Sequence, residues 1–355
     1  MDANSPCPAR PDVVGKGSDM TTATLRYLSR SDVATLGGDH SDLYMSAIEA
    51  GFRSHAAGDF VQPLKPYLRS PRTQHIADRI IAMPAWIGGE QPVAGLKWIG
   101  SKHDNPARRG MERASAVIVL NDPETNYPMA IMEGGLLSAM RTAAVTGVAT
   151  RHLARKNFEE AAIIGCGPIG ERQAQMLLEQ FAGVKALRLF DLREEAAHAL
   201  AARLSQRFGD LVIAVTKSAE AAVRDCPVVI TCTVTDKPYL AFDWLSKGTF
   251  LANVSIMDVE RDVFLKVDKV VVDDWDQSNR EKKIINLLVE AGEFSRERLH
   301  AELGEIIVGS KPGRETVDEI ILLNPMGMAI DDIACAKAIL SRAEDRNIGT
   351  VLPLF

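Results

Sequence analysis

The segment Gly165-Cys166-Gly167-Pro168-Ile169-Gly170 constrains the fold most, because its three glycines follow an apolar run and precede a stretch with helical periodicity. In such a strand–loop–helix unit the first glycine permits a tight turn and the second lets the backbone approach a pyrophosphate. The third allows close helix packing, and the helix N-terminus faces the phosphates. Asp191 ends the next apolar run, about 20 residues on, where a carboxylate binds ribose hydroxyls and disfavours a 2′-phosphate. The sequence predicts NAD as the cofactor. Arg193 leaves the strictness against NADP open, and a glycine turn without a ligand is the alternative.

Short apolar runs alternate with helical stretches from Ala161 onward. The runs are 161–165, 186–191, 211–216, 228–233, 249–255 and 269–274. Strands separated by helices are typical of βαβ units and a parallel sheet. We therefore expect an α/β fold with a doubly wound, Rossmann-type parallel sheet in an NAD-binding domain over 155–320.

The rest of the chain has a different pattern. A helix is expected over 41–57, then Gly/Pro-punctuated strands at 79–83, 93–99, 116–120 and 129–133, and a helix over 137–156. Strands in close succession favour an antiparallel or mixed sheet. The tail gives a strand, a glycine turn and an amphipathic helix, which we expect to pack back onto this part. The prediction is a second α+β domain for substrate binding and dimerisation, formed by 25–154 and 321–355, after a flexible leader at 1–24.

Composition excludes several classes of protein. A hydrophobic content of 46% and a charged content of 25% are typical of a globular chain. No apolar run reaches the roughly 20 residues that a membrane-spanning helix needs. The net charge of −6 disfavours a nucleic-acid partner. The five cysteines form no CxxC pair, so we expect no metal site, no disulfide framework and a reducing cytoplasm.

Positive charge is concentrated in one segment. Between Gln62 and Arg113 nine Lys or Arg residues face four acidic ones, an excess of five in a chain of net charge −6. A basic segment in an acidic protein fits an anionic small-molecule substrate, and a solvated face with local ion pairs is the alternative. Arg79, Lys97 and Arg141 are the informative residues of this domain. Lys97 ends an apolar stretch and Arg141 lies in a small, apolar helix start, where a charge is costly unless it meets an anion. Structural salt bridges are the alternative for each.

Open α/β sheets bind ligands beyond the carboxyl ends of their strands. Thr231, Cys232 and Thr233 end the fourth run, so we expect them near the cofactor's ribose, with buried strand ends as the alternative. Asp258 lies just past the fifth run, where an acid could face the nicotinamide and the reacting carbon, or could simply cap a turn. Cys166 and Cys232 are expected to fill space.

The combination of KWIGSKHDNP, MRTAA, IIGCGPIG, ITCTVTDKP, NVSIMD and LLNPMGMAIDD resembles the ornithine cyclodeaminase/μ-crystallin family, from about Leu25 onward. Longer segments such as HIADRIIAMP, VVVDDWDQSNREKK and LHAELG resemble its siderophore-pathway branch. That branch is implied to oxidise N-[(2S)-2-amino-2-carboxyethyl]-L-glutamate with NAD, giving L-2,3-diaminopropionate, 2-oxoglutarate and NADH. The resemblance implies a homodimer that supplies the assembly of siderophores or peptide antibiotics.

Carried over by position, Arg79, Lys97 and Arg141 would hold substrate carboxylates, and Lys97 and Asp258 would be catalytic. Ser255 and Met257 would join the glycine loop and Thr231–Thr233 in binding the cofactor. The chain reads SIMDVERDV where ornithine cyclodeaminases read roughly GGDCPGKTE, which puts proline-forming cyclisation in doubt. Ornithine cyclodeamination and ketimine or keto-acid reduction remain alternatives, as does a non-enzymatic nucleotide-binding protein.

Overall fold

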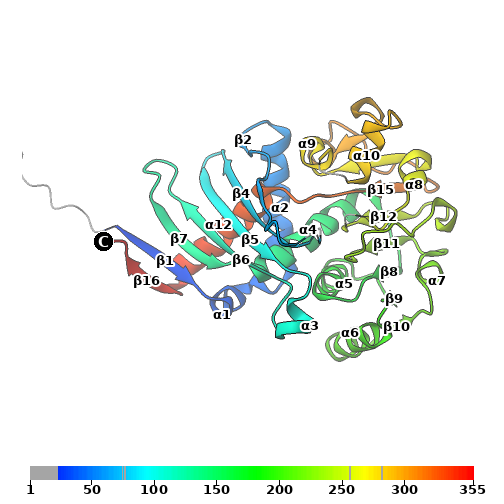
Figure 1. Ribbon diagram of the computed structural model, residues 1–355, viewed down its shortest axis with the longest axis horizontal. Coiled ribbons are helices and arrows are strands. Elements are labelled where there is room, and N and C mark those ends of the chain that lie inside the picture. The colour runs from blue at the N-terminus through cyan, green and yellow to red at the C-terminus, as the bar shows by residue number, and fades with distance from the viewer. Residues whose placement is uncertain (1–22, 74, 76, 256, 281–282) are drawn as a thin grey trace, which may run out of the picture.

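The computed structural model describes residues 23–73, 75, 77–255, 257–280 and 283–355. Two sheets lie side by side, with the long helix α4 (Gly135–Leu153) between them (Figure 1). The predicted leader at 1–24 lies outside the described residues except for its last two, and Thr24 already begins strand β1. No helix in the described part of the chain combines the length and apolarity that crossing a membrane requires.

The second sheet is the predicted Rossmann sheet. All its described pairings are parallel, in the order β10-β9-β8-β11-β12-β15-β13-β14. Its strands are β8 (Glu160–Ile164), β9 (Ala186–Phe190), β10 (Val212–Val215), β11 (Val228–Thr231), β12 (Phe250–Asn253), β13 (Lys269–Val272), β14 (Ala301–Glu302) and β15 (Ile321–Leu323). The helices of this part are α5 (Pro168–Gln180), α6 (Glu194–Arg207), α7 (Ala219–Val223), α8 (Arg261–Lys266), α9 (Trp275–Ser278), α10 (Ile284–Glu290) and α11 (Leu303–Ile307), with 3₁₀ turns η2 (Phe242–Trp244) and η3 (Arg296–Arg298). Central strands such as β11 and β12 are buried along their whole length, because helices cover both faces.

One predicted domain boundary is wrong. The sequence interpretation ended the Rossmann domain at residue 320, but β15 (Ile321–Leu323) pairs with both β12 and β13. The apolar run at 321–323 is fully buried and therefore suits an interior strand of the parallel sheet. The chain thus leaves the Rossmann sheet only after Leu323.

The first sheet is mixed. Its order is β16-β1-β7-β6-β5-β4-β2, with β3 added on β4; β1 and β7 are parallel and the other pairs antiparallel. The strands are β1 (Thr24–Leu28), β2 (Phe60–Val61), β3 (Tyr67–Leu68), β4 (Arg79–Ile87), β5 (Val93–Ser101), β6 (Ala114–Asn121), β7 (Pro128–Glu133) and β16 (Thr350–Pro353). The remaining elements are α1 (Arg30–Val33), the π-helix η1 (Ala34–Gly38), α2 (Ser41–Ala56), α3 (Asn105–Arg109) and α12 (Ala329–Arg346). Because β16 pairs with β1, the two ends of the described chain meet at one edge of this sheet (Figure 1).

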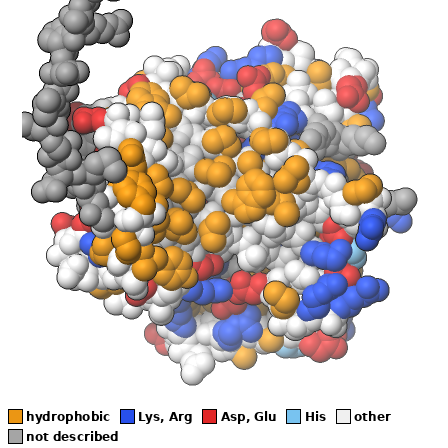
Figure 2. Space-filling view, turned by 60° about the vertical axis from the view of Figure 1, so that its left-hand side comes forward, with side chains coloured by type: hydrophobic (Ala, Val, Ile, Leu, Met, Phe, Trp, Pro, Cys, Tyr) orange, Lys and Arg blue, Asp and Glu red, His pale blue; other side chains and the backbone are white. Residues whose placement is uncertain are grey.

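The two faces of the mixed sheet differ. Helix α12 packs on β4, β5 and β6, and on helices α2 and α4, which confirms that the tail returns to the first part of the chain. Strand alternation directs Lys97, Ile118 and Met132 toward these helices, where they are buried. The opposite face keeps large apolar side chains exposed, and Figure 2 shows hydrophobic groups gathered on this side of the molecule. They are Tyr27, Ile80, Trp98, Val117 and Leu352.

Candidate active site

A cavity lies between the two sheets. The mixed sheet contributes side chains of β4 and β5, and α4 contributes Ser138, Arg141 and Thr142. The Rossmann side contributes Ile169 of the glycine loop and the loops after β11, β12 and β15. Six cationic residues line it, and among the described lining residues there is no carboxylate. The six are Lys65, Arg79, Lys97, Arg113, Arg141 and Lys283.

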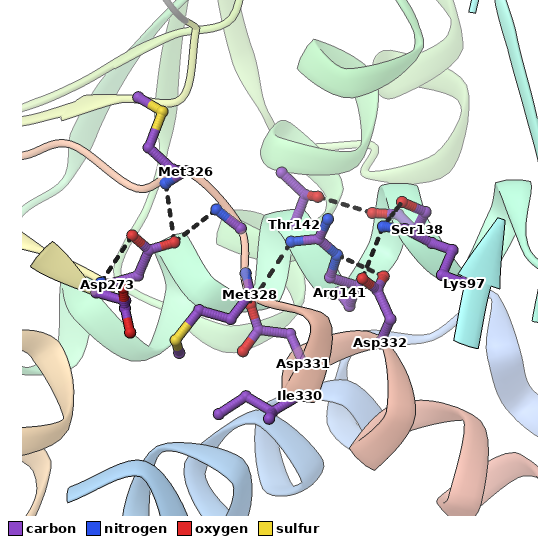
Figure 3. A network of polar contacts seen from close by, with 12 residues as sticks. Lys97, Ser138, Arg141, Thr142, Asp273, Met326, Met328, Ile330, Asp331 and Asp332 are labelled. Carbon is purple, nitrogen blue, oxygen red and sulfur yellow. Dashed lines mark hydrogen bonds and ion pairs between the residues drawn. The ribbon is translucent and has the colours of Figure 1, made fainter. Parts of the chain in front are cut away.

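Lys97 and Arg141 meet buried carboxylates at the start of helix α12 (Figure 3). The Lys97 ammonium lies 2.7 Å from Asp332 Oδ2 and 3.1 Å from Ser138 Oγ. Arg141 Nε donates to Asp332 Oδ1 at 2.9 Å, and its Nη1 lies 3.6 Å from Asp331 Oδ2. All five residues are less than 10% exposed. Both cations form the structural salt bridges that were the alternative for these residues, and the two acids make their burial tolerable. Their role in substrate binding stays a prediction.

The pKa values of two members of this cluster, Lys97 and Asp331, are displaced toward neutrality. Burial lowers the pKa of Lys97 to about 7, and Arg141 acts in the same direction while Asp332 opposes it. Burial raises the pKa of Asp331 to about 7, against the attraction of Arg141. A lysine with a pKa near neutrality can exchange a proton with a substrate at physiological pH.

A second group of contacts fixes the loop between β15 and α12. Lys65 is 4% exposed; its ammonium donates to Met326 O at 2.9 Å and also to Gly327 O. Asp273, fully buried after β13, accepts from Met326 N at 2.8 Å and Gly327 N at 2.5 Å. In Figure 3, Asp273 and Met326 lie at one side of the network, Lys97 and Ser138 at the other, and Arg141 between them. Burial lowers the pKa of Lys65 to about 8.

The glycine loop fits a dinucleotide. Gly165 has φ +97°, and a Cβ there would lie 3.0 Å from the Cys232 carbonyl. A Cβ on Gly170 would lie 2.0 Å from Gly165 O, whereas one on Gly167 meets nothing within 4 Å. The open side at Gly167 lies at the N-terminus of α5, where Pro168 is the first residue. This is the arrangement that a pyrophosphate requires. Asp191, directly after β9, accepts from Cys166 N at 2.8 Å and Arg193 N at 2.9 Å, which holds its carboxylate beside the loop.

The strand ends after β11 and β12 divide into lining and buried residues. Cys232, Thr233, Ser255 and Met257 line the cavity, as expected for residues near a cofactor. Thr231 does not line it. Its side chain is fully buried and donates to Asn253 Oδ1 at 2.9 Å. The Thr231 side chain therefore matches the alternative of a buried strand end, since it lies beside Asn253, its partner on β12.

Asp258 also lies behind the cavity wall. It is fully buried and is absent from the lining residues. Its carboxylate accepts from Thr233 Oγ1 at 2.5 Å, Thr233 N at 3.2 Å and the Tyr239 hydroxyl at 3.2 Å. Burial raises the pKa of Asp258, and the bonds from Thr233 oppose that shift. The predicted direct contact of Asp258 with the reacting amine does not fit this position; the residue of this segment that faces the cavity is Met257.

The described cysteines and histidines take no part in the charged cluster of Lys97, Arg141, Asp331 and Asp332. The described cysteines Cys166, Cys226, Cys232 and Cys335 are free thiols. Burial raises the pKa of Cys166 to about 12, which fits its predicted space-filling role. Among the described residues one group, His75, Asp78 and His103, has the composition of a metal site. Asp78 there already accepts hydrogen bonds from Thr73, Lys102 and His103.

Several functional candidates were missed in the sequence. Asp331 and Asp332 follow the last glycine turn, where two acids are typical of an ordinary helix N-terminus. Lys65 and Arg113 were counted in the basic segment but not singled out, and Lys283 lies in another part of the chain. The sequence marks such residues only as charges within otherwise apolar stretches, and this pattern does not indicate which charged residues contact one another.

Comparison with known proteins assigns the chain to a family. The profile of the ornithine cyclodeaminase/mu-crystallin family matches residues 28–347. The chain belongs to this family. It is 57% identical over 330 residues to N-((2S)-2-amino-2-carboxyethyl)-L-glutamate dehydrogenase of Staphylococcus aureus, which covers 93% of this chain and 98% of that protein.

Solved structures of the family share the whole fold. An archaeal alanine dehydrogenase dimer with bound NAD superposes with a TM-score of 0.83 at 33% identity, covering 94% of this chain and 100% of that one. The Thermococcus litoralis Δ1-pyrroline-2-carboxylate reductase, in complex with NADH and L-proline, gives 0.84 at 29% identity, covering 92% and 99%. The expected α/β fold with a Rossmann domain is thereby confirmed.

Proposed function

We propose that this protein is an NAD-dependent dehydrogenase of N-[(2S)-2-amino-2-carboxyethyl]-L-glutamate, which it cleaves to L-2,3-diaminopropionate and 2-oxoglutarate. The observation that carries the proposal is the charge of the cavity beside the nucleotide loop. Six cationic residues line it, without a described lining carboxylate. A substrate with three carboxylates matches such a cavity better than alanine, proline or ornithine, which carry one each. The supply of diaminopropionate follows from this activity.

Bound NAD supplies the hydride acceptor for the oxidation. Arg141 and Lys97, with Arg79 on the same face of the sheet, bind the α-carboxylate of the glutamate part and so fix its Cα toward the nucleotide loop. Positioning of this kind contributes roughly 7–11 kcal/mol when the reacting atoms are held in a near-attack geometry. The buried acids Asp331 and Asp332 hold the two cations in place.

Lys97 is the proposed base. Its neutral form accepts the proton of the secondary amine as the C–H bond is oxidised, which leaves a C=N bond. Water then adds to the imine carbon, and the C–N bond breaks. The oxygen of the added water remains on 2-oxoglutarate, and the nitrogen leaves with diaminopropionate. Lys97 suits the task because its pKa is about 7 and it lies in the cavity wall.

Asp258 acts through Thr233. By accepting from both the hydroxyl and the amide of Thr233, it fixes the orientation of a residue that lines the cavity next to the nucleotide loop. We assign it a positioning role in place of the direct catalytic role that the sequence predicted.

The proposal includes a homodimer, formed through the face of the mixed sheet that lies opposite helix α12. Tyr27, Trp98 and Val117 are each about 40% exposed on that face, and an apolar patch of this kind marks an interface. The archaeal relative is a dimer. Trp98→Glu should produce monomers in light scattering, whereas Val212→Glu, an exposed change on the Rossmann edge strand β10, should leave the assembly intact. Monomers in the unchanged protein would contradict this assignment.

The reaction is tested with purified protein, NAD and synthetic N-[(2S)-2-amino-2-carboxyethyl]-L-glutamate. We expect NADH absorbance to rise and mass spectrometry to detect 2-oxoglutarate and 2,3-diaminopropionate in equal amounts. Parallel reactions contain L-alanine, L-proline or L-ornithine. NADH formation with alanine or proline alone, or proline formation from ornithine, would assign the protein to another activity of the family.

A further inference from the structure

The six cations of the cavity differ in their counter-ions. Lys97 and Arg141 both contact Asp332, at 2.7 and 2.9 Å. Arg113 and Lys283 form no ion pair with any residue in the described part of the chain. A cation that already has a buried carboxylate partner is stabilised without a ligand, whereas a buried cation without one is costly until an anion binds.

Arg113 lies directly before strand β6. Its backbone carbonyl accepts from Lys102 N at 2.9 Å, which fixes the end of the β5–β6 connection. Within the described residues nothing hydrogen-bonds to its guanidinium, which lines the cavity. Arg113 is partly buried, which lowers its pKa, and no acid in the described part of the chain opposes this shift.

Lys283 lies on the opposite wall, before helix α10. It is 7% exposed, and its ammonium donates to the Gln277 carbonyl at 3.1 Å. Burial lowers its pKa to about 7, and the positive charges of Lys65, Arg79 and Arg280 act in the same direction while Asp273 opposes them.

Both residues line the same cavity, Arg113 from the mixed-sheet side and Lys283 from the Rossmann side. Arg79 begins β4 and pairs with Ser101, which pairs with Ala114 next to Arg113. Lys283 interacts electrostatically with the same Arg79. The guanidinium of Arg79 lies 5.1 Å from the Tyr67 ring centre, and that of Arg280 lies 5.6 Å from it on the side of the chain that carries Lys283.

We propose that Arg113 and Lys283 form a second anion subsite, which binds the carboxylates that the substrate carries beyond the one held by Lys97 and Arg141. The inference rests on the proposed function and names the feature that separates this cavity from one for a monocarboxylic amino acid. Lys97 and Arg141 can bind the carboxylate of any α-amino acid, whereas the second subsite selects substrates that carry further carboxylates.

The test combines two variants with three compounds. Arg113→Met and Lys283→Met remove the charges and keep side-chain bulk. The compounds are the full substrate, N-(2-aminoethyl)-L-glutamate, which lacks the carboxylate of the diaminopropionate part, and N-[(2S)-2-amino-2-carboxyethyl]-L-2-aminobutyrate, which lacks the side-chain carboxylate of the glutamate part. Arg108→Met and Lys247→Met, at side chains 72% and 80% exposed, are the matched controls. Unchanged NAD affinity verifies that each variant is folded.

Each subsite variant should lower kcat/KM for the full substrate by about 10- to 150-fold, the value of one charge-assisted hydrogen bond. For each variant, kcat/KM should fall much less with one of the two shortened compounds, namely the one that lacks the carboxylate bound by the substituted residue, because that interaction is already absent. Equal losses on all three compounds, or no loss on any, would overturn the assignment.

Calorimetric binding of the same compounds to the NADH-loaded protein separates this inference from the proposed reaction. Absent turnover with carboxylate-dependent binding through Arg113 and Lys283 would reject the reaction and keep the subsite. If turnover of the full substrate is normal, but the loss caused by each variant simply adds to the loss caused by each missing carboxylate, the reaction is kept and the subsite is rejected. A failure of the unchanged protein to bind any of the three compounds would reject both.

Discussion

The two walls of the cavity differ, because the Rossmann wall contains the glycine loop with its exposed backbone, whereas the wall beside the mixed sheet carries most of the charged side chains. The loop from Gly165 to Gly170 works by keeping side chains away from a phosphate. The opposite wall works by holding Lys97 and Arg141 against acids from the far end of the chain. A wall built of backbone depends on local spacing, and a wall built of charge depends on long-range partners. The two walls should therefore respond differently to substitution.

The largest effect is expected at the charged wall, from Lys97→Met. Removing the proposed base should lower kcat by about 10²–10⁴-fold. Because the pKa of Lys97 is lowered to about 7, its neutral form increases above that pH, so kcat/KM of the unchanged enzyme should rise as pH rises through about 7. The variant should lose that rise, and Lys247→Met should keep it. An identical pH profile in both would remove Lys97 from the chemistry.

The charged wall should also make stability depend on pH. Burial raises the pKa of Asp331 to about 7, above its value near 4 in an unfolded chain. The folded protein therefore binds this proton more tightly, and the stability it confers at low pH is lost as pH rises toward 7. The variant Asp331→Asn cannot take up this proton, so it should not show that loss. Between pH 5 and 7 the free energy of unfolding of the unchanged protein should fall by about 2 kcal/mol more than that of the variant, as measured by urea denaturation. Parallel curves for the two proteins would contradict the shift.

The backbone wall is tested by a matched pair of glycine changes. Gly167→Ala adds a methyl group where there is open space, so NAD affinity should fall about tenfold with little change in stability. Gly170→Ala forces a methyl group to 2.0 Å from Gly165 O, so the free energy of unfolding should fall by about 1–3 kcal/mol. Calorimetry with NAD and urea denaturation measure the two effects. An equal stability loss in both variants would show that Gly167 has a packing role.

The smallest effect is expected from Asp258→Asn, behind the Rossmann wall of the cavity. Asparagine keeps the size and an acceptor oxygen, so Thr233 should be displaced only slightly and kcat should fall by less than tenfold. A base or acid in direct contact with substrate would cost at least a hundredfold. A loss of that size, together with a shifted pH profile, would return Asp258 to a direct role.

The backbone wall was largely predictable from the sequence. The glycine spacing and the apolar runs identified six of the eight described parallel strands, β8 to β13, and the loop within a few residues, because each strand–loop–helix unit is local. The prediction failed at β15, where a run of three apolar residues gave no local sign of which sheet it joins.

The charged wall was predictable only in part. Arg79, Lys97 and Arg141 could be singled out as charges in unusual places, but Asp331 and Asp332 looked like ordinary residues of a helix N-terminus. Strand-end side chains such as Thr231 and Asp258 were assigned to the cavity from position alone. Their orientation depends on neighbours such as Asn253 and Tyr239, which one-dimensional patterns do not reveal.

The return of α12 to the first sheet also bears on synthesis. Arg141 and its partner Asp332 are separated by 191 residues, which a ribosome takes about 10–40 s to make. During that interval the nascent chain carries two cations in an apolar sheet-and-helix layer without their counter-ions, so this layer cannot close. The Rossmann strands, complete at Leu323, can assemble earlier. The second layer should thus be the last to fold, after helix α12 has been synthesised.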